Sequence, residues 1–211
     1  MHRREVRFVE GYPHGPTASI DATDAALDGL DPQDAILAVE GVSDQIAVET
    51  LAAATGIDLA GRGVSVVPIG GAHAIGRFVE EHGTRRLLGL VDRAEAHLVA
   101  RALARRTGTE VGVADLDAHG FAVLDPDLEG AMLTALGERR VLACFAAEDD
   151  DRSWQRFVRQ PAWRDRGFDE QARRFIGARA RRKSRYADVF ARAAVAHDVV
   201  PRPLTRLLER C

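Results

Sequence analysis

The apolar positions of the chain fall into short runs that alternate with longer amphipathic segments. Mainly apolar runs occur at 35–39, 64–68, 87–91 and 120–124. Runs of this length predict buried strands, and the segments of ~10–13 residues between them carry apolar residues at helical spacing. Strands that alternate with helices indicate β-α-β units. The sequence therefore predicts an α/β fold, with a mainly parallel sheet flanked by helices.

Glycines mark the predicted ends of the helices between these strands. A glycine follows each predicted end, at about Thr55, His82, Thr107 and Leu136. Glycine suits this position because it readily adopts the left-handed conformation that closes many helices. At the start of the first of these helices, Ser43 and Asp44 are placed to cap it.

The two ends of the chain differ in character from the predicted sheet. Residues 1–33 are rich in turn formers, with a weakly helical acidic stretch, and predict an N-terminal arm or edge hairpin. The C-terminal part is basic and predicts four helices, at 153–160, 169–176, 184–195 and 203–210. We therefore expect an arm (1–33), a sheet domain (34–150) and a helical extension (151–211) that completes the site.

Acidic side chains follow three of the four predicted strands. They stand at a strand end or shortly after it, at Glu40, Asp44, Asp92, Glu95, Asp127 and Glu129. Because the carboxyl ends of parallel strands meet at one edge of a sheet, these side chains are expected to converge. Carboxylates that converge repel one another, and a hard divalent cation with oxygen ligands relieves that repulsion.

Several of these acids also have a purely structural interpretation. Asp44 can act only as a helix cap, Glu95 and Glu129 can simply favour helix N-termini, and Asp127 can belong to a turn. Glu40 and Asp92 are harder to explain in this way, since each ends a strand that the pattern predicts to be buried.

Bulk composition narrows the class of protein. The chain has 211 residues, of which 46% are hydrophobic, enough for a real core. No apolar run approaches the roughly 20 residues that span a bilayer, and the N-terminus does not resemble a secretory signal. The two cysteines, Cys144 and Cys211, lack metal-binding spacing. We therefore expect a cytoplasmic protein without a membrane segment, a disulfide framework or a zinc site.

Charge is distributed unevenly along the chain. The net charge is −3, but acids concentrate in the first 150 residues and arginines follow from Arg152 onward. An acidic site with a basic flank is compatible with binding a polyanion through a metal ion. Lys183 is the only lysine. A GC-rich genome explains the scarcity of lysine, while a need for a compact ammonium group would explain why one remains.

Short motifs in a fixed order support a more specific interpretation. V-E-G-V-S-D at 39–44, V-V-P-I-G-G at 66–71, L-L-G-L-V-D at 87–92 and D-L-E at 127–129 resemble, in this order, the TOPRIM domain of the OLD (overcoming lysogenization defect) family nucleases. The segment R-R-K-S-R-Y-A at 181–187 resembles OLD C-terminal regions. The similarity runs from about Ala35 to the C-terminus. It extends in particular to the short, stand-alone TOPRIM nucleotidyl transferase/hydrolase domain proteins of actinobacteria.

The resemblance implies roles for the acidic residues. It places metal ligands at Glu40, Asp44, Asp92 and Glu129, with Asp127 beside them, and it implies one or two Mg²⁺ or Mn²⁺ ions. The usual D-x-D motif of TOPRIM domains is absent, because the chain reads Asp92-Arg93-Ala94. Glu95, one residue further on, is the candidate substitute for the missing second aspartate.

The resemblance also implies an activity. Lys183 matches the lysine that OLD nucleases place near the scissile phosphate, and together with Glu40 it would act in catalysis. The implied function is divalent-metal-dependent phosphodiester hydrolysis of nucleic acid, most naturally DNA. No G-x-x-x-x-G-K-[ST] motif occurs, so any ATP dependence is expected to come from a separate ATPase partner.

Other functions stay open at the level of the sequence. A catalytically weak binding or regulatory module, acting with a partner chain, would keep the fold and the metal site. The missing second aspartate favours this alternative, whereas the intact Glu40, Asp44 and Lys183 oppose it. Nucleotidyl transfer, as in primases and topoisomerases, ranks last because no second catalytic domain is evident. The sequence is also compatible with an oligomer.

Overall fold

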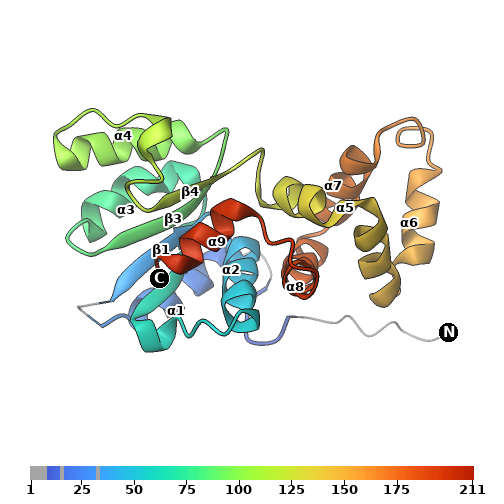
Figure 1. The fold of residues 1–211 in the computed structure, drawn as a ribbon, viewed down its shortest axis with the longest axis horizontal. Coiled ribbons are helices and arrows are strands. Elements are labelled where there is room, and N and C mark those ends of the chain that lie inside the picture. The colour runs from blue at the N-terminus through green and yellow to red at the C-terminus, as the bar shows by residue number, and fades with distance from the viewer. Residues whose placement is uncertain (1–8, 15–16, 32–33) are drawn as a thin grey trace.

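The computed structural model describes residues 9–14, 17–31 and 34–211 and contains one parallel sheet (Figure 1). Its strands are β1 (Ala35–Val39), β2 (Val64–Pro68), β3 (Leu87–Asp92) and β4 (Phe121–Leu124). They pair in the order β2-β1-β3-β4, and every pair is parallel. The predicted α/β fold with a parallel sheet is therefore confirmed.

Helices cover both faces of this sheet. In the described residues they are α1 (Ala18–Asp28), α2 (Val42–Ala54), α3 (Ile75–His82), α4 (Ala96–Thr107), α5 (Leu128–Ala147), α6 (Asp151–Val158), α7 (Phe168–Gly177), α8 (Ala180–Ala196) and α9 (Arg202–Glu209). Short 3-10 helices occur at η1 (Ala60–Arg62), η2 (Ala72–Ala74) and η3 (Val113–Asp115). No helix in the described ranges is both long and apolar enough to cross a membrane.

Side chains of β1 point alternately to the two faces of the sheet and so contribute to two separate layers of the core. Leu37 and Val39 belong to one hydrophobic cluster, which includes side chains of α2, α5, α8 and α9. Ile36 and Ala38 belong to the other, which is formed with α3 and α4. All residues of β1 are buried, because side chains of a strand point alternately to the two covered faces.

The helix that follows β1 begins earlier than the sequence predicts. Its N-cap is Gly41, not Ser43 or Asp44. Asp44 lies at the third helical position, where its carboxylate accepts a hydrogen bond of 3.0 Å from the backbone N–H of Gly41. The acid therefore helps to close the start of α2, as expected, but from inside the first turn.

The weakly helical acidic stretch predicted before the sheet forms α1, so the alternative of an edge hairpin is wrong for residues 17–31. Ala22 of this helix is buried against Val42 and Ile46 of α2. The hydroxyl of Thr23 donates a hydrogen bond to the carbonyl of Pro68 at the end of β2. The remaining part of the expected arm (1–33) lies partly outside the described residues, which exclude 1–8, 15–16 and 32–33.

The predicted helix at 128–136 is followed directly by a second helical segment. Gly137 has φ 72° and ψ 159°, which are not helical, so the predicted end agrees with the structure, and a segment that the sequence did not predict extends α5 to Ala147. Val141 and Phe145 restart the buried face beyond the kink. A glycine in the left-handed region interrupts the backbone hydrogen bonds, and the apolar spacing after it decides whether a helix resumes.

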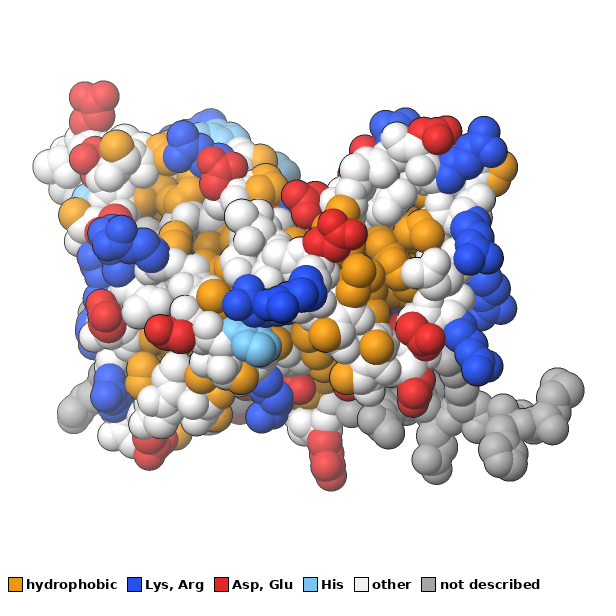
Figure 2. All heavy atoms as spheres, turned by 45° about the vertical axis from the view of Figure 1, so that its right-hand side comes forward, with side chains coloured by type: hydrophobic (Ala, Val, Ile, Leu, Met, Phe, Trp, Pro, Cys, Tyr) orange, Lys and Arg blue, Asp and Glu red, His pale blue; other side chains and the backbone are white. Residues whose placement is uncertain are grey.

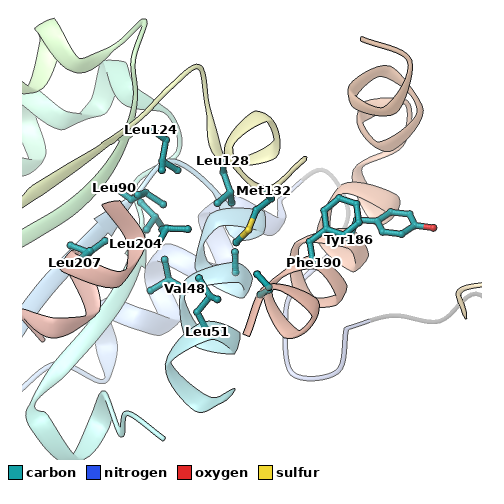
Figure 3. Close-up of a cluster of buried hydrophobic side chains, with 14 of the residues drawn as sticks. Val48, Leu51, Leu90, Leu124, Leu128, Met132, Tyr186, Phe190, Leu204 and Leu207 are labelled. Atoms are coloured by element: carbon teal, nitrogen blue, oxygen red, sulfur yellow. The ribbon is translucent and has the colours of Figure 1, made fainter. Parts of the chain in front are cut away.

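The C-terminal helices share a core with the sheet (Figure 3). Leu204 and Leu207 of α9 pack in the same cluster as Leu90 of β3 and Leu124 of β4. Phe145 lies at the centre of an aromatic group, with ring centroids 5.1 Å from those of Trp154, Phe175 and Tyr186. The predicted positions of these four helices agree with the structure to within a few residues.

The outer surface is hollowed between two lobes (Figure 2). One lobe contains the sheet with α3 and α4, and the other contains α6 and α7 (Figure 1). Aspartate and glutamate side chains lie at the base of this hollow, and basic side chains run along the far end of the second lobe. Acidic side chains therefore lie in the hollow, while a row of basic side chains lies away from it.

Candidate metal centre

The site forms at the carboxyl edge of the sheet, where β1 ends. The backbone N–H of Ile69 donates to the carbonyl of Val39 at 2.8 Å, and that of Gly71 donates to the carbonyl of Glu40 at 3.0 Å. The loop after β2 is thereby held against the end of β1. Gly70 and Gly71 have φ of 75° and 109°, which other residues rarely adopt, so the loop needs glycine at both places. This arrangement fixes the backbone of Glu40.

Three carboxylates meet at this edge. Glu40, Asp92 and Glu95 each offer an oxygen atom that lies within 4.8 Å of the other two. Asp92 is the last residue of β3, and Glu95 is the N-cap residue of α4. A turn joins them, since the N–H of Glu95 donates to the carbonyl of Asp92 at 3.0 Å. The end of β3 and the start of α4 therefore bring the carboxylate of Glu95 close to those of Glu40 and Asp92.

The donor set of these three residues fits a hard divalent cation. Mg²⁺ and Ca²⁺ bind oxygen at about 2.0–2.6 Å, so oxygens that share one ion lie at most about 5 Å apart. The spacing of the three carboxylates satisfies this limit. All three side chains are partly buried, so they are accessible to an ion.

Electrostatics at the edge favour a bound cation. Burial raises the pKa of Asp92 to about 7, and the nearby charges of Asp44 and Glu40 add to this effect. Burial also raises the pKa of Glu40, with a further contribution from Glu95. Without a cation, these groups hold protons that exposed carboxylates would release. A positive ion would reverse the shifts, because it stabilises the charged forms.

Asp44 lies beside this triad. Burial raises its pKa to about 7, against the opposing effects of Lys183 and of the hydrogen bond from Gly41. Repulsion from Glu129 and Glu40 raises it further. Asp44 thus belongs to the same electrostatic cluster, although the hydrogen bond that its carboxylate accepts from Gly41 serves the start of α2.

The lone lysine is at the same edge. Nζ of Lys183, in the first turn of α8, lies 2.9 Å from Oε1 of Glu129, in the first turn of α5. Burial alone would lower the pKa of Lys183, but Glu129, Asp44 and Glu40 outweigh it, so the pKa is raised. The ammonium group therefore stays charged next to the carboxylates.

Asp127 has partners of its own. It is the N-cap of α5 and accepts a hydrogen bond of 2.8 Å from the N–H of Gly130. Its two oxygens also pair with the guanidinium of Arg173, Oδ1 at 2.9 Å from Nη1 and Oδ2 with Nη2. A Cβ at position 130 would lie 2.6 Å from Arg173, so glycine makes this close approach possible. Metal binding by Asp127 would have to compete with this ion pair.

A buried ion network fixes the segment that carries Lys183. Asp150 is 4% exposed and accepts a hydrogen bond of 3.1 Å from the hydroxyl of Tyr186. It also pairs with Arg185 and, at 3.5 Å, with Nε of Arg182. These three partners flank Lys183 in the N-terminal half of α8. They anchor that half to the start of α6.

The sequence predicts the acidic residues of the site. It does not predict that Arg173 pairs with Asp127, or that Asp150 pairs with Arg182 and Arg185. The sequence places Arg173 in a basic stretch that would serve as a phosphate-binding flank only if it folded back onto the acidic edge. Arg173 and Lys183 do reach this edge, through Asp127 and Glu129. Asp150 lies 35 residues before Arg185 in the sequence. Its place just before a helix is the one sequence feature that singles it out. No local pattern indicates such pairs.

A parallel sheet with carboxylates at the ends of its first and third strands is the arrangement of a TOPRIM-type α/β domain. Residues 33–81 match the family described as "Overcoming lysogenization defect protein-like, TOPRIM domain". The OLD-like TOPRIM resemblance predicted from the motifs is therefore confirmed for this segment. A comparison with curated protein sequences gave no match.

Solved structures of OLD proteins share the fold. The C-terminal region of the Burkholderia pseudomallei OLD protein superposes with a TM-score of 0.58 at 19% identity, covering 84% of this chain and 96% of that one. The C-terminal region of the Xanthomonas campestris pv. campestris OLD protein gives a TM-score of 0.59 at 22% identity, with 85% and 95% covered. The likeness includes the C-terminal helices as well as the sheet, because it covers most of both chains.

Proposed function

We propose that this protein is a Mg²⁺- or Mn²⁺-dependent phosphodiester hydrolase that acts on DNA. The observation that carries the proposal is the meeting of Glu40, Asp92 and Glu95 beside the Lys183–Glu129 pair. The match to an OLD-like TOPRIM domain supports it. The fold shared with OLD C-terminal regions is compatible with it.

In this proposal the three carboxylates of the triad hold the cation. A divalent ion bound there lowers the pKa of water and neutralises negative charge on a phosphate. Glu40 and Asp92 end rigid strands, so their positions are set by the sheet. Glu95 supplies the third oxygen from the start of α4. Asp44 and Glu129 add negative potential that raises the local affinity for cations.

Lys183 would act on the phosphate. Its ammonium is held at the edge by Glu129 and stays charged, so it is placed to stabilise charge on the scissile phosphate or on the leaving oxygen. Glu129 is then a positioning residue, because it acts through Lys183. Any ATP dependence of cleavage would come from a separate ATPase chain.

The alternative is a catalytically weak binding or regulatory module that works with a partner chain. The altered D-x-D motif favours this alternative. The position of Glu95 opposes it, since that side chain lies with Glu40 and Asp92 where a further ligand is needed. The two functions differ in whether the isolated protein cleaves DNA.

A cleavage assay separates them. Supercoiled and linear DNA are incubated with the protein in Mg²⁺, Mn²⁺ or EDTA, and Glu40→Gln is compared with the control Glu81→Gln. Glu81 is an exposed acid of α3 that pairs with Arg77 at 3.8 Å. Hydrolysis that needs metal, is lost in Glu40→Gln and persists in Glu81→Gln supports the proposal. DNA binding without cleavage in either metal would support the alternative.

A further inference from the structure

The second lobe carries a row of arginines on and next to α6, at the end of the molecule away from the sheet. Arg152 and Arg156 lie on one face of α6, and Arg159, the C-cap residue, follows on the same side, because residues four and three positions apart lie on the same side of a helix. All three are exposed, while Trp154 on the opposite face is buried. Figure 2 shows basic side chains along this end of the molecule.

A fourth arginine joins the row from α7. The guanidinium of the exposed Arg174 lies 6.0 Å from the centre of the Trp163 ring. The Trp163 ring stacks on Phe157 of α6 at 5.3 Å between centroids. An aromatic pair therefore links the arginine of α7 to the row on α6. We call Arg152, Arg156, Arg159 and Arg174 the arginine face.

Charge on this face is not balanced by nearby acids. Residues 151–183 contain eleven basic and four acidic side chains. Within the described residues, none of the four arginines of the face forms an ion pair with a carboxylate. Exposed arginines elsewhere do, as in Arg166 with Glu170 at 3.1 Å and Arg192 with Asp188 at 2.9 Å.

Helix electrostatics stabilise only part of this arrangement. Arg156 and Arg159 lie at the C-terminal end of α6, where positive charge is favourable. Like charges four positions apart on a helix destabilise it by about 0.2–0.5 kcal/mol, and Arg152 also places a positive charge in the first turn of α6, at the positive end of the helix dipole. A polyanion bound across the face would relieve the repulsion. The surface therefore fits a ligand better than it fits a stabilising role.

We propose that the arginine face is a second binding surface for the nucleic-acid backbone, separate from the acidic edge. This inference rests on the proposed function for the identity of the polyanion. The carboxylates of the acidic edge repel phosphates unless a cation is bound, so a basic surface elsewhere on the molecule would add affinity for the strand. The face would hold a flanking part of the nucleic acid through its phosphates, without reading base sequence.

The test measures DNA binding in EDTA, where no cleavage occurs and the acidic edge repels DNA. A short fluorescent duplex is titrated with the full chain over a range of KCl concentrations. The variant Arg152→Gln/Arg156→Gln/Arg159→Gln keeps good helix formers but removes three charges. The control Arg101→Gln/Arg105→Gln/Arg106→Gln removes three exposed arginines from α4, which lies in the other lobe.

The α6 variant is expected to bind more weakly, with a log–log salt dependence shallower by about 0.9 for each phosphate that it no longer neutralises. Its melting temperature should be unchanged or higher, because like-charge repulsion is removed. The α4 variant should bind as the parent does. Equal affinity and equal salt dependence for the α6 variant and the parent would overturn the inference, and so would an equal loss in the α4 variant. If the proposed cleavage activity is absent, only the assay with metal reports it. The binding test in EDTA therefore decides the role of the arginine face independently of cleavage.

Discussion

Nζ of Lys183 lies 2.9 Å from Oε1 of Glu129, which joins the first turn of α8 to the first turn of α5. A carboxylate is favourable at a helix N-terminus, whereas an ammonium group is not. The pair therefore compensates an unfavourable charge on α8. It also holds the only lysine of the chain at the edge where Glu40 and Asp92 meet.

The first prediction concerns this lysine. Lys183→Ala should lower the rate of DNA cleavage by about 10²–10³, because a preorganised charge near the phosphate is lost. Lys183→Arg should also be impaired, since a planar guanidinium does not replace a compact ammonium. Single-turnover cleavage at saturating enzyme measures both. Arg192→Ala, at an exposed site of the same helix, is the control. Full activity of Lys183→Ala would remove this residue from the mechanism.

The second prediction concerns metal binding by Glu40 and Asp92. In EDTA, Glu40→Gln and Asp92→Asn should be as stable as the parent or more stable, because one repelling carboxylate is neutralised. Adding Mn²⁺ should raise the melting temperature of the parent, and it should raise that of both variants by less. Thermal melts with and without Mn²⁺ measure this, with Glu81→Gln as the control. An equal gain in all proteins would show that neither residue is a ligand.

The third prediction is a pH dependence of stability. The pKa values of Asp44 and Asp92 are raised to about 7 in the folded protein, against ~3.9 in an unfolded chain. Between these values the folded state binds more protons than the unfolded state, so the free energy of unfolding should fall as pH rises from about 4 to about 7. Urea unfolding in EDTA at several pH values measures this trend.

A variant and a metal ion both test the cause of this trend. Asp92→Asn removes one of the two groups and should make the dependence on pH shallower. Saturating Mn²⁺ should act most strongly at the high end of the range, where the carboxylates are charged. A free energy of unfolding that rises with pH over this range in EDTA would contradict the assignment.

The fourth prediction concerns the buried anchor of α8. Asp150→Ala should destabilise the protein by about 3–5 kcal/mol, because it leaves the largely buried charge of Arg182 without its carboxylate partner and Arg185 with only Glu148, at 3.7 Å. Asp165 forms an exposed pair with Arg164, so Asp165→Ala should lower the free energy of unfolding by at most about 1 kcal/mol. Chemical denaturation measures both values. Similar small costs for the two variants would mean that Asp150 does not anchor the helix.

The sequence alone predicts the sheet and the meeting of Glu40 and Asp92 at one of its edges. Apolar runs determine where strands form, and parallel pairing brings the ends of strands together. For this reason the order of strands and acids along the chain is enough to place Glu40 and Asp92 at one edge. The spacing of Glu95 from Asp92 makes it the expected substitute ligand, and its carboxylate does lie close to both acids.

Features that depend on docking between distant segments cannot be predicted in this way. The pairing of Arg173 with Asp127 follows from how α7 packs against α5, which no local pattern contains. Helix α1 buries little more than Ala22 in the described core, so its apolar periodicity is weak. The sequence predicts the helix end at Gly137 but not the segment that resumes directly after it, because glycine at positive φ is compatible with either outcome.

Joint binding of one divalent cation by Glu40, Asp92 and Glu95 is the basis of the proposed function. Anomalous diffraction from a crystal grown with Mn²⁺ locates the ion directly. We expect a peak within coordination distance of one carboxylate oxygen of each of the three residues. A peak held by Asp127 or Glu129 without Glu95, or no peak at the carboxyl edge of the sheet at saturating Mn²⁺, would contradict it.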